Sequence, residues 1–184
     1  MVSNIHSRVI TADAEAVGRL LDTLATDDDR LWPIQQWPAM RFDRSLGVNA
    51  VGGHGPIRYT CVKYIPGREV KFRFHRPSGF DGTHGFLVEA LDARHTRLTH
   101  ELIMRTRGKD RLTWPLLWRW LHDALLEDSL DRAETALVPG TTPRNHHSPY
   151  VRFLRSRIHS DEARKHAARQ LPSPASAQES GAVR

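Results

Sequence analysis

The sequence has 184 residues, of which 39% are hydrophobic and 26% charged, and its formal net charge is +6. These values are typical of one globular domain that can bury a hydrophobic core, and they exclude a low-complexity or collagen-like chain. The single cysteine, Cys61, excludes an intrachain disulfide and a cysteine cluster for zinc.

The positive charge is concentrated at the end of the chain. Residues 139–184 contain eight basic and three acidic side chains, which leaves a net charge of +1 for residues 1–138. Nucleic-acid-binding domains normally carry a basic surface, so we do not expect the domain itself to bind nucleic acid. The N-terminus lacks the pattern of a signal peptide, and no apolar run approaches the ~20 residues of a membrane-spanning helix. We therefore expect a cytoplasmic protein.

The first 43 residues are predicted to form one strand and two short helices. Residues 4–10 (NIHSRVI) alternate as a strand does. Residues 11–25 have apolar side chains at helical spacing, with Thr11 as the N-cap. Residues 26–43 contain two Trp-Pro breaks, which are typical of a short helix followed by a loop.

A series of strands and one long helix are predicted to follow. The strand candidates are residues 48–57, 58–65, 69–75, 82–91 and 96–106, and the tight turns at 66–68 and 92–95 predict antiparallel hairpins. The helix is expected to begin at Thr113 and to end before Pro139-Gly140. Asp128 and Arg132 interrupt its apolar side and are spaced to pair, whereas another side is acidic, with Asp123, Glu127, Asp131 and Glu134.

This order of elements predicts an α+β fold, in which a curved antiparallel sheet wraps around a long C-terminal helix, with two short helices after the first strand. Four stretches resemble the START/Bet v 1-like (SRPBCC) superfamily and its polyketide cyclase/dehydrase-type branch: residues 4–32, 56–74, 81–104 and 116–137. The resemblance implies a helix-grip domain over residues 1–140 that encloses an apolar cavity for a small hydrophobic molecule. Residues 141–184 are expected to be a basic, partly disordered tail that can form a short amphipathic helix.

Two histidines are predicted to point into the domain. By strand alternation His84 shares a face with Phe86, and His100 shares a face with Met104. Pairing across the turns places His84 opposite Leu102 or Met104, so the two imidazoles become diagonal neighbours. Pairing across 66–68 places Tyr59 opposite Phe74. The complete predicted ligand-binding set is Tyr59, Phe72, Phe74, His84, Phe86, His100, Met104, Trp118, Leu121, Leu125, Asp128 and Arg132.

The sequence allows more than one chemical role for these residues. His84 and His100 are either hydrogen-bonded core polar groups or, together with Tyr59, general acids and bases. A metal site would need further ligands, for which His54 or Asp128 are available, and we predict neither a metal nor another cofactor.

Three functions follow from these features. The first is binding of a small hydrophobic or aromatic molecule in a central cavity. The second is a cyclase- or dehydratase-like enzyme that uses His84, His100 or Tyr59. The third is an interaction module whose basic tail contacts a membrane or a partner. The pattern fits a monomer or a homodimer.

Overall fold

The computed structural model describes residues 1–157 and divides the chain into two units, Met1–His146 and His147–Arg184. The sequence placed this boundary at residue 140. The chain between the two positions belongs to the first unit because the backbone N–H groups of Arg144 and Asn145 both donate to the Asp131 carboxylate, each at 2.6 Å.

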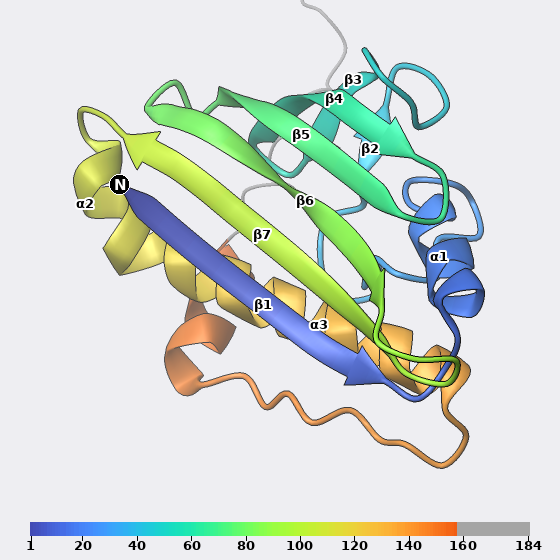
Figure 1. The fold of residues 1–184 in the computed structure, drawn as a ribbon. Coiled ribbons are helices and arrows are strands. Elements are labelled where there is room, and N and C mark those ends of the chain that lie inside the picture. Colours follow the sequence, from blue (N-terminus) through green and yellow to red (C-terminus); the bar gives the residue numbers. More distant parts are fainter. Residues whose placement is uncertain (158–184) are drawn as a thin grey trace, which may run out of the picture. The chain divides into compact units, whose positions relative to one another are not determined.

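The first unit is built on a curved, seven-stranded antiparallel sheet in the order β1-β7-β6-β5-β4-β3-β2 (Figure 1). The two predicted hairpins join β4 to β5 and β6 to β7. The strands are β1 (Val2–Ile10), β2 (Arg41–Phe42), β3 (Val51–His54), β4 (Ile57–Ile65), β5 (Glu69–Arg76), β6 (Phe80–Ala90) and β7 (Thr96–Thr106).

Two details of the sheet differ from the prediction. The expected strand over residues 48–57 is split, because the chain reverses at Gly55, which has a φ of 49°, and at Pro56, so that β3 pairs with β4. The two-residue strand β2 pairs with β3 and was not predicted, since two residues carry no recognisable alternation.

Helix α1 (Ala14–Asp22) begins two residues later than expected. Its N-cap is Asp13, whose carboxylate accepts a hydrogen bond from the Ala16 N–H at 2.7 Å, so the predicted cap Thr11 is wrong. A carboxylate caps a helix as well as a hydroxyl does, and its negative charge also interacts favourably with the positive end of the helix dipole.

The long helix begins earlier than expected and is interrupted once. It consists of α2 (Asp110–Thr113), a π-helical turn η1 (Trp114–Trp118) and α3 (Arg119–Leu137). Thr113 does not cap it, because its hydroxyl donates to the Asp110 carboxylate at 2.7 Å. Pro115 has no N–H to donate within the helix, and the Arg119 N–H reaches the Trp114 carbonyl to close the wider turn.

Residues 23–40 form turns and bends in place of the predicted second helix. The buried Asp29 carboxylate organises them, since it accepts hydrogen bonds from the N–H groups of Ala25, Leu31 and Trp32 at 2.7–3.0 Å. An aspartate that binds nearby N–H groups offers the backbone an alternative to a helix, which explains the incorrect prediction.

Two glycines allow β6 to pass very close to its neighbours. A Cβ atom on Gly82 would lie 2.2 Å from the Ile103 carbonyl oxygen, and one on Gly85 would lie 2.0 Å from the Val70 carbonyl oxygen. These distances leave no room for a side chain at either position. His84 therefore lies on a segment of β6 whose path depends on the glycines around it.

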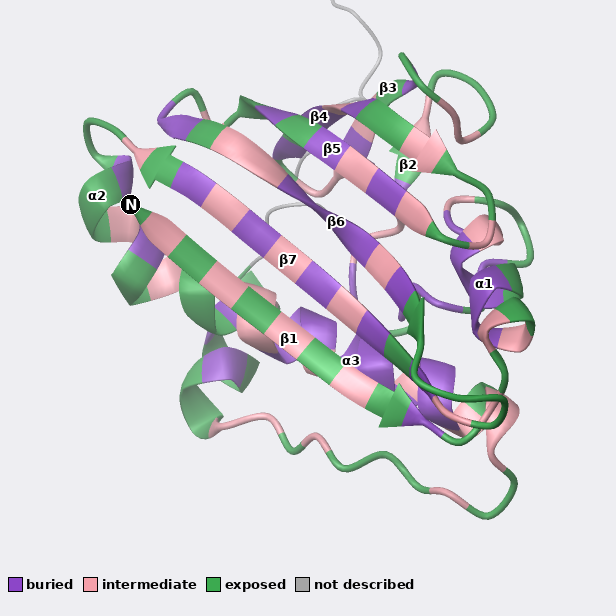
Figure 2. Cartoon of the chain, in the orientation of Figure 1, coloured by how far each residue is buried: buried purple, intermediate pink, exposed green. Residues whose placement is uncertain are grey.

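The core lies on the face of the sheet that carries the even-numbered residues of β7. Along this strand Thr96, Leu98, His100, Leu102 and Met104 are buried, whereas the residues between them are exposed or half-buried (Figure 2). This strict alternation is the pattern of a sheet with one covered face. Leu121, Leu125 and Leu126 of α3 are buried as well.

In the second unit, residues 149–157 are helical, and the Arg157 guanidinium lies 5.9 Å from the centre of the Phe153 ring. The amphipathic helix predicted for the tail has an apolar stripe of Tyr150, Phe153, Leu154 and Ile158, of which Ile158 lies outside the described residues. None of the helices within residues 1–157 is long and apolar enough to cross a membrane.

Candidate functional site

The strand register brings the predicted polar groups together on the inner face of the sheet. His84 lies opposite Leu102, Phe86 lies opposite His100, and Tyr59 lies opposite Phe74, as the turn positions predicted. His84 is 7% exposed and His100 is 2% exposed, and Tyr59 is fully buried. These three residues are called the interior polar cluster below.

The two imidazoles of the cluster form a hydrogen-bonded pair. His84 Nδ1 lies 3.4 Å from His100 Nε2, which is the long end of the hydrogen-bonding range. The other two ring nitrogens, His84 Nε2 and His100 Nδ1, are buried and have no hydrogen-bond partner within the described chain. A neutral imidazole has one donor and one acceptor nitrogen. Whichever ring donates within the pair, the outer nitrogens therefore offer one donor and one acceptor.

Tyr59 adds a third polar group of the same kind. Its hydroxyl is buried and has no hydrogen-bond partner among the described residues. Its ring lies edge-on to His84, with 4.8 Å between the ring centroids. Phe72 and Phe74 contact His84 with centroid distances of 5.3 and 4.5 Å. The polar atoms of the cluster are thus surrounded by aromatic side chains.

Burial keeps the cluster uncharged. It lowers the pKa of His84 and of His100 well below the ordinary value of 6.5, and repulsion from neighbouring histidines lowers both pKa values further. Burial likewise raises the pKa of Tyr59 far above its ordinary value of 10.0. His54, whose ring lies 6.0 Å from that of Tyr59, has a pKa lowered to about 3 by burial and then by nearby positive charge.

The other predicted apolar residues surround this cluster. Phe86 packs edge-on against His100 at 4.8 Å, and Met104, Leu121 and Leu125 are buried. Trp118 is half-buried and contacts Phe80, with 6.3 Å between ring centroids.

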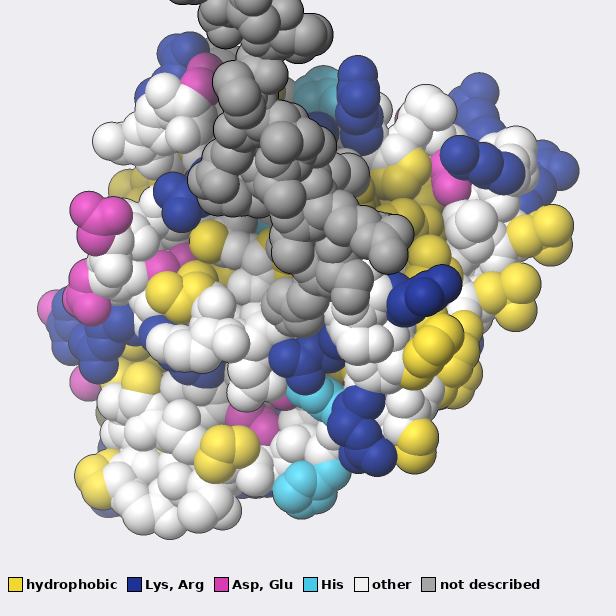
Figure 3. All heavy atoms as spheres, turned by 180° about the vertical axis from the view of Figure 1, so that it is seen from behind, with side chains coloured by type: hydrophobic (Ala, Val, Ile, Leu, Met, Phe, Trp, Pro, Cys, Tyr) yellow, Lys and Arg dark blue, Asp and Glu magenta, His cyan; other side chains and the backbone are white. Residues whose placement is uncertain are grey.

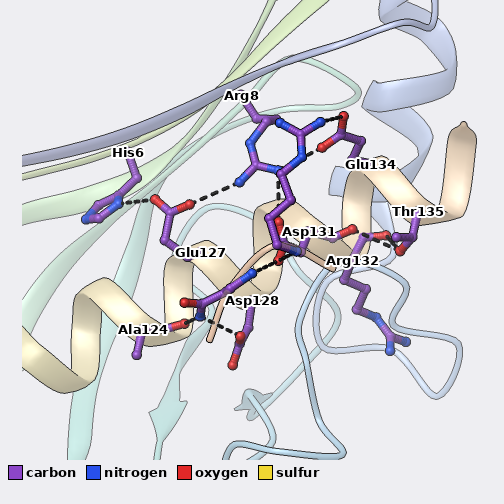
Figure 4. Close-up of polar contacts among 11 residues, drawn as sticks. His6, Arg8, Ala124, Glu127, Asp128, Asp131, Arg132, Glu134 and Thr135 are labelled. Atoms are coloured by element: carbon purple, nitrogen blue, oxygen red, sulfur yellow. Dashed lines mark hydrogen bonds and ion pairs between the residues drawn. The ribbon is translucent and has the colours of Figure 1, made fainter. Parts of the chain in front are cut away.

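Asp128 and Arg132 do not pair with each other as predicted. The Asp128 carboxylate accepts hydrogen bonds from Trp37 Nε1 and from Asn145 Nδ2, both at 2.7 Å. Arg132 donates to the Asp29 carbonyl at 2.7 Å, and Figure 4 shows the two side chains pointing apart. Spacing along a helix indicates which residues can pair, but both side chains find better partners in segments far away in sequence.

The acidic side of α3 is the feature that sequence reasoning missed. The sequence identified this side as acidic without a partner for it, and in the structure it faces β1, whose His6 and Arg8 bind it (Figure 4). Arg8 donates to Glu127, Asp131 and Glu134 at 3.0, 2.9 and 2.7 Å. The signal was present in the sequence, because His6 and Arg8 alternate with Ile5, Ser7 and Val9 and so mark the inner face of β1 as polar.

Comparison with known proteins places the fold but not the function. No protein-family model matches the chain, and no curated protein matches its sequence significantly. A conserved protein of unknown function from Enterococcus faecalis is similar in structure, with 16% sequence identity and a TM-score of 0.54, and the match covers 88% of this chain and 85% of that one. A Thermobifida fusca protein has 15% identity and a TM-score of 0.57, and the match covers 80% of this chain and 100% of that one. CalU16 from Micromonospora echinospora has 15% identity and a TM-score of 0.52, and the match covers 88% of this chain and 86% of that one. At these identities the similarity shows a shared α+β fold alone.

Proposed function

We propose that the protein is a START/Bet v 1-like domain of the helix-grip type, and that it binds a small hydrophobic or aromatic molecule with an uncharged polar group. The interior polar cluster is the observation that supports this proposal. A buried polar atom without a partner costs about 1–3 kcal/mol. The cluster holds three such atoms in an aromatic setting, and a ligand that pairs with them would remove that cost.

The cluster also defines the polar group of the ligand. Its outer nitrogens offer one donor and one acceptor, and Tyr59 offers a hydroxyl that serves as either. Since burial keeps His84 uncharged, the cluster supplies no positive charge for a carboxylate. We therefore expect a phenol, an alcohol or a ketone to be preferred over an acid of the same shape.

Replacing Tyr59 with phenylalanine is expected to weaken ligand binding about tenfold while leaving the free protein as stable or more stable. One lost hydrogen bond is worth roughly 1.4 kcal/mol in binding, and removal of an unpaired buried hydroxyl relieves the free protein of its desolvation cost. A panel of neutral naphthols and matched naphthoic acids, titrated against an apolar dye, measures the affinities. Thermal unfolding of the free protein measures the stability.

The matched control is Tyr64→Phe. The Tyr64 hydroxyl donates to Asp22 at 2.8 Å, so its loss is expected to lower stability and to leave the affinity for the panel unchanged. The proposal fails if no hydrophobic class binds, if acids and neutral compounds bind equally, or if Tyr59→Phe behaves as Tyr64→Phe does.

An enzyme on the same fold is the second candidate, and the neutral His84–His100 pair is the observation that favours it. An uncharged imidazole can accept a proton from a substrate carbon or hydroxyl while Tyr59 donates to a carbonyl, as cyclisation or dehydration requires. If it is an enzyme, polyketide-like phenolic ketones are expected to turn over. Replacement of His84 by leucine is then expected to reduce kcat at least ~100-fold with dye binding intact. Turnover that is unchanged in this variant would dismiss the assignment.

The remaining expectations stay predictions. On the face shown in Figure 3, basic side chains lie beside hydrophobic ones, and acidic side chains gather mainly at the left. That the domain does not bind nucleic acid stays a prediction from the near-neutral charge of residues 1–138. A cytoplasmic location, a homodimer and a partner or membrane contact through the basic tail are further proposals that rest on the sequence.

A further inference from the structure

We propose that His6, His122 and Asp123 form a binding site for a divalent transition-metal ion, with Zn²⁺ as the best match. The proposal does not require the ligand proposed for the interior polar cluster, although the two sites adjoin, since the His122 ring lies 5.2 Å from that of His100. One ligand atom from each of these residues lies within 4.8 Å of the others. Two imidazole nitrogens and one carboxylate oxygen form a donor set that zinc uses in proteins, with a fourth position left for water or substrate.

The distances are close to those that a shared ion requires. His6 Nε2 lies 3.1 Å from Asp123 Oδ1, and His122 Nδ1 lies 4.0 Å from the same oxygen. Ligands at about 2.0–2.1 Å from a tetrahedral zinc ion are roughly 3.3–3.4 Å apart. The first distance is slightly shorter than this spacing and the second is longer, so binding an ion requires the His122 ring to move toward Asp123.

His122 supplies a separate indication of a ligand. Both of its ring nitrogens are buried and have no hydrogen-bond partner in the described part of the chain. Buried polar atoms are normally paired, so an imidazole with both nitrogens unpaired requires an explanation. A metal ion bound at Nδ1 would account for that nitrogen, which otherwise has only the Asp123 carboxylate at 4.0 Å. The side chains of His122 and Asp123 are 16% and 32% exposed, so the proposed site lies near the surface of the domain.

Glu127 completes the arrangement behind His6. Its carboxylate lies 2.7 Å from His6 Nδ1, on the opposite side of the ring from Asp123. A carboxylate at this position accepts the Nδ1 proton and leaves the Nε2 lone pair free for a metal, which is how metal-bound histidines are usually oriented in proteins. Arg8 in turn holds Glu127 at 3.0 Å, so the residue behind the site is itself fixed.

The alternative is that His6 is simply a protonated partner of two carboxylates. That arrangement accounts for His6, Asp123 and Glu127, but it leaves His122 unexplained. The two alternatives therefore differ in what His122 does, and the test is designed around this residue.

The full-length protein, freed of metal by a chelator, is titrated with Zn²⁺ by calorimetry and with Co²⁺ by visible spectroscopy. We expect one equivalent of Zn²⁺ to bind and Co²⁺ to give the intense absorption of a four- or five-coordinate site. Loss of a residue that only hydrogen-bonds to a metal ligand lowers metal affinity by about 10–100-fold. Glu127→Gln is therefore expected to weaken binding by about tenfold, and His122→Ala, which removes a direct ligand, by at least ~100-fold. A double replacement of His146 and His147 by alanine controls for binding by other histidines and is expected to change nothing.

If His122→Ala does not fold by circular dichroism, Asp123→Asn replaces it, because the amide keeps the shape and loses the charge. The proposal is overturned if the wild-type protein binds no divalent transition metal, if a folded His122→Ala or Asp123→Asn variant binds as the wild type does, or if the His146 and His147 replacement abolishes the signal.

Discussion

Replacing Arg8 with methionine is expected to lower the free energy of unfolding by about 3–5 kcal/mol. Arg8 of β1 binds three carboxylates of α3, and the side chains of Arg8 and Asp131 are only 13% and 4% exposed. Loss of the guanidinium leaves the buried Asp131 carboxylate with only the backbone N–H groups of Arg144 and Asn145 and no opposite charge, which costs more than the ion pair contributes. Urea unfolding followed by tryptophan fluorescence measures the change.

Arg19→Met provides the matched control. Arg19 binds Glu15 at the same 2.7 Å that separates Arg8 from Glu134, but its side chain is 64% exposed and that of Glu15 is 85% exposed. A solvated pair of this kind is worth about 0.5 kcal/mol or less. Addition of Asp131→Asn to Arg8→Met is expected to recover part of the lost stability, because the amide is uncharged and its oxygen can still accept the backbone N–H groups of Arg144 and Asn145. Equal, small losses in the two arginine variants would show that burial of the Arg8 cluster is unimportant.

Lowering the pH from 7.5 to 5.0 is expected to remove about 4 kcal/mol of stability through His54 and His84 together. Both have folded-state pKa values well below the unfolded value of 6.5, that of His54 being about 3. Their contribution is fully present above pH 6.5. Below it, the unfolded chain binds protons that the folded chain excludes, so each histidine costs about 1.4 kcal/mol per pH unit.

The groups near these histidines do not offset the effect, and His100, whose pKa burial also lowers well below 6.5, adds to the measured loss. Tyr59 is uncharged. Repulsion from neighbouring histidines lowers the pKa values of His54 and His84 further, and Arg58 also lowers that of His54. Urea unfolding at the two pH values measures the loss. His84→Phe is expected to reduce it by about 2 kcal/mol, whereas His95→Gln on the exposed β6–β7 turn is the control. An unchanged pH dependence in His84→Phe would contradict the assignment of a neutral, buried imidazole.

Most of the sheet can be predicted because its information is local. The alternation in 96–106 and the turn at 92–95 together determine the register of β6 against β7, and with it the inward position of His84 and His100. The same reasoning gives the pairing of Tyr59 with Phe74. A turn and the alternating strands beside it can be recognised within about 20 neighbouring residues.

The remaining contacts depend on residues far apart in the chain. Arg8 and Asp131 are 123 residues apart, and Trp37 and Asp128 are 91 residues apart. The candidate metal site likewise joins His6 to a helix more than a hundred residues away. No local pattern specifies which acidic residues a strand will meet. The helix wheel therefore identified the acidic face of α3 correctly as a group but did not indicate that β1 would bind it.

The position of β1 at one edge of the sheet has a kinetic consequence. Its inner face needs the carboxylates of α3, and Glu134 is among the last residues of the first unit to be synthesised. Until then His6 and Arg8 lack their partners, and β1 has only its hydrogen bonds to β7. Contacts between such distant segments slow folding, because the loop between them must close first. A nascent chain that stops before α3 would thus have all seven strands but an uncovered inner face, with His6 and Arg8 of β1 unpaired.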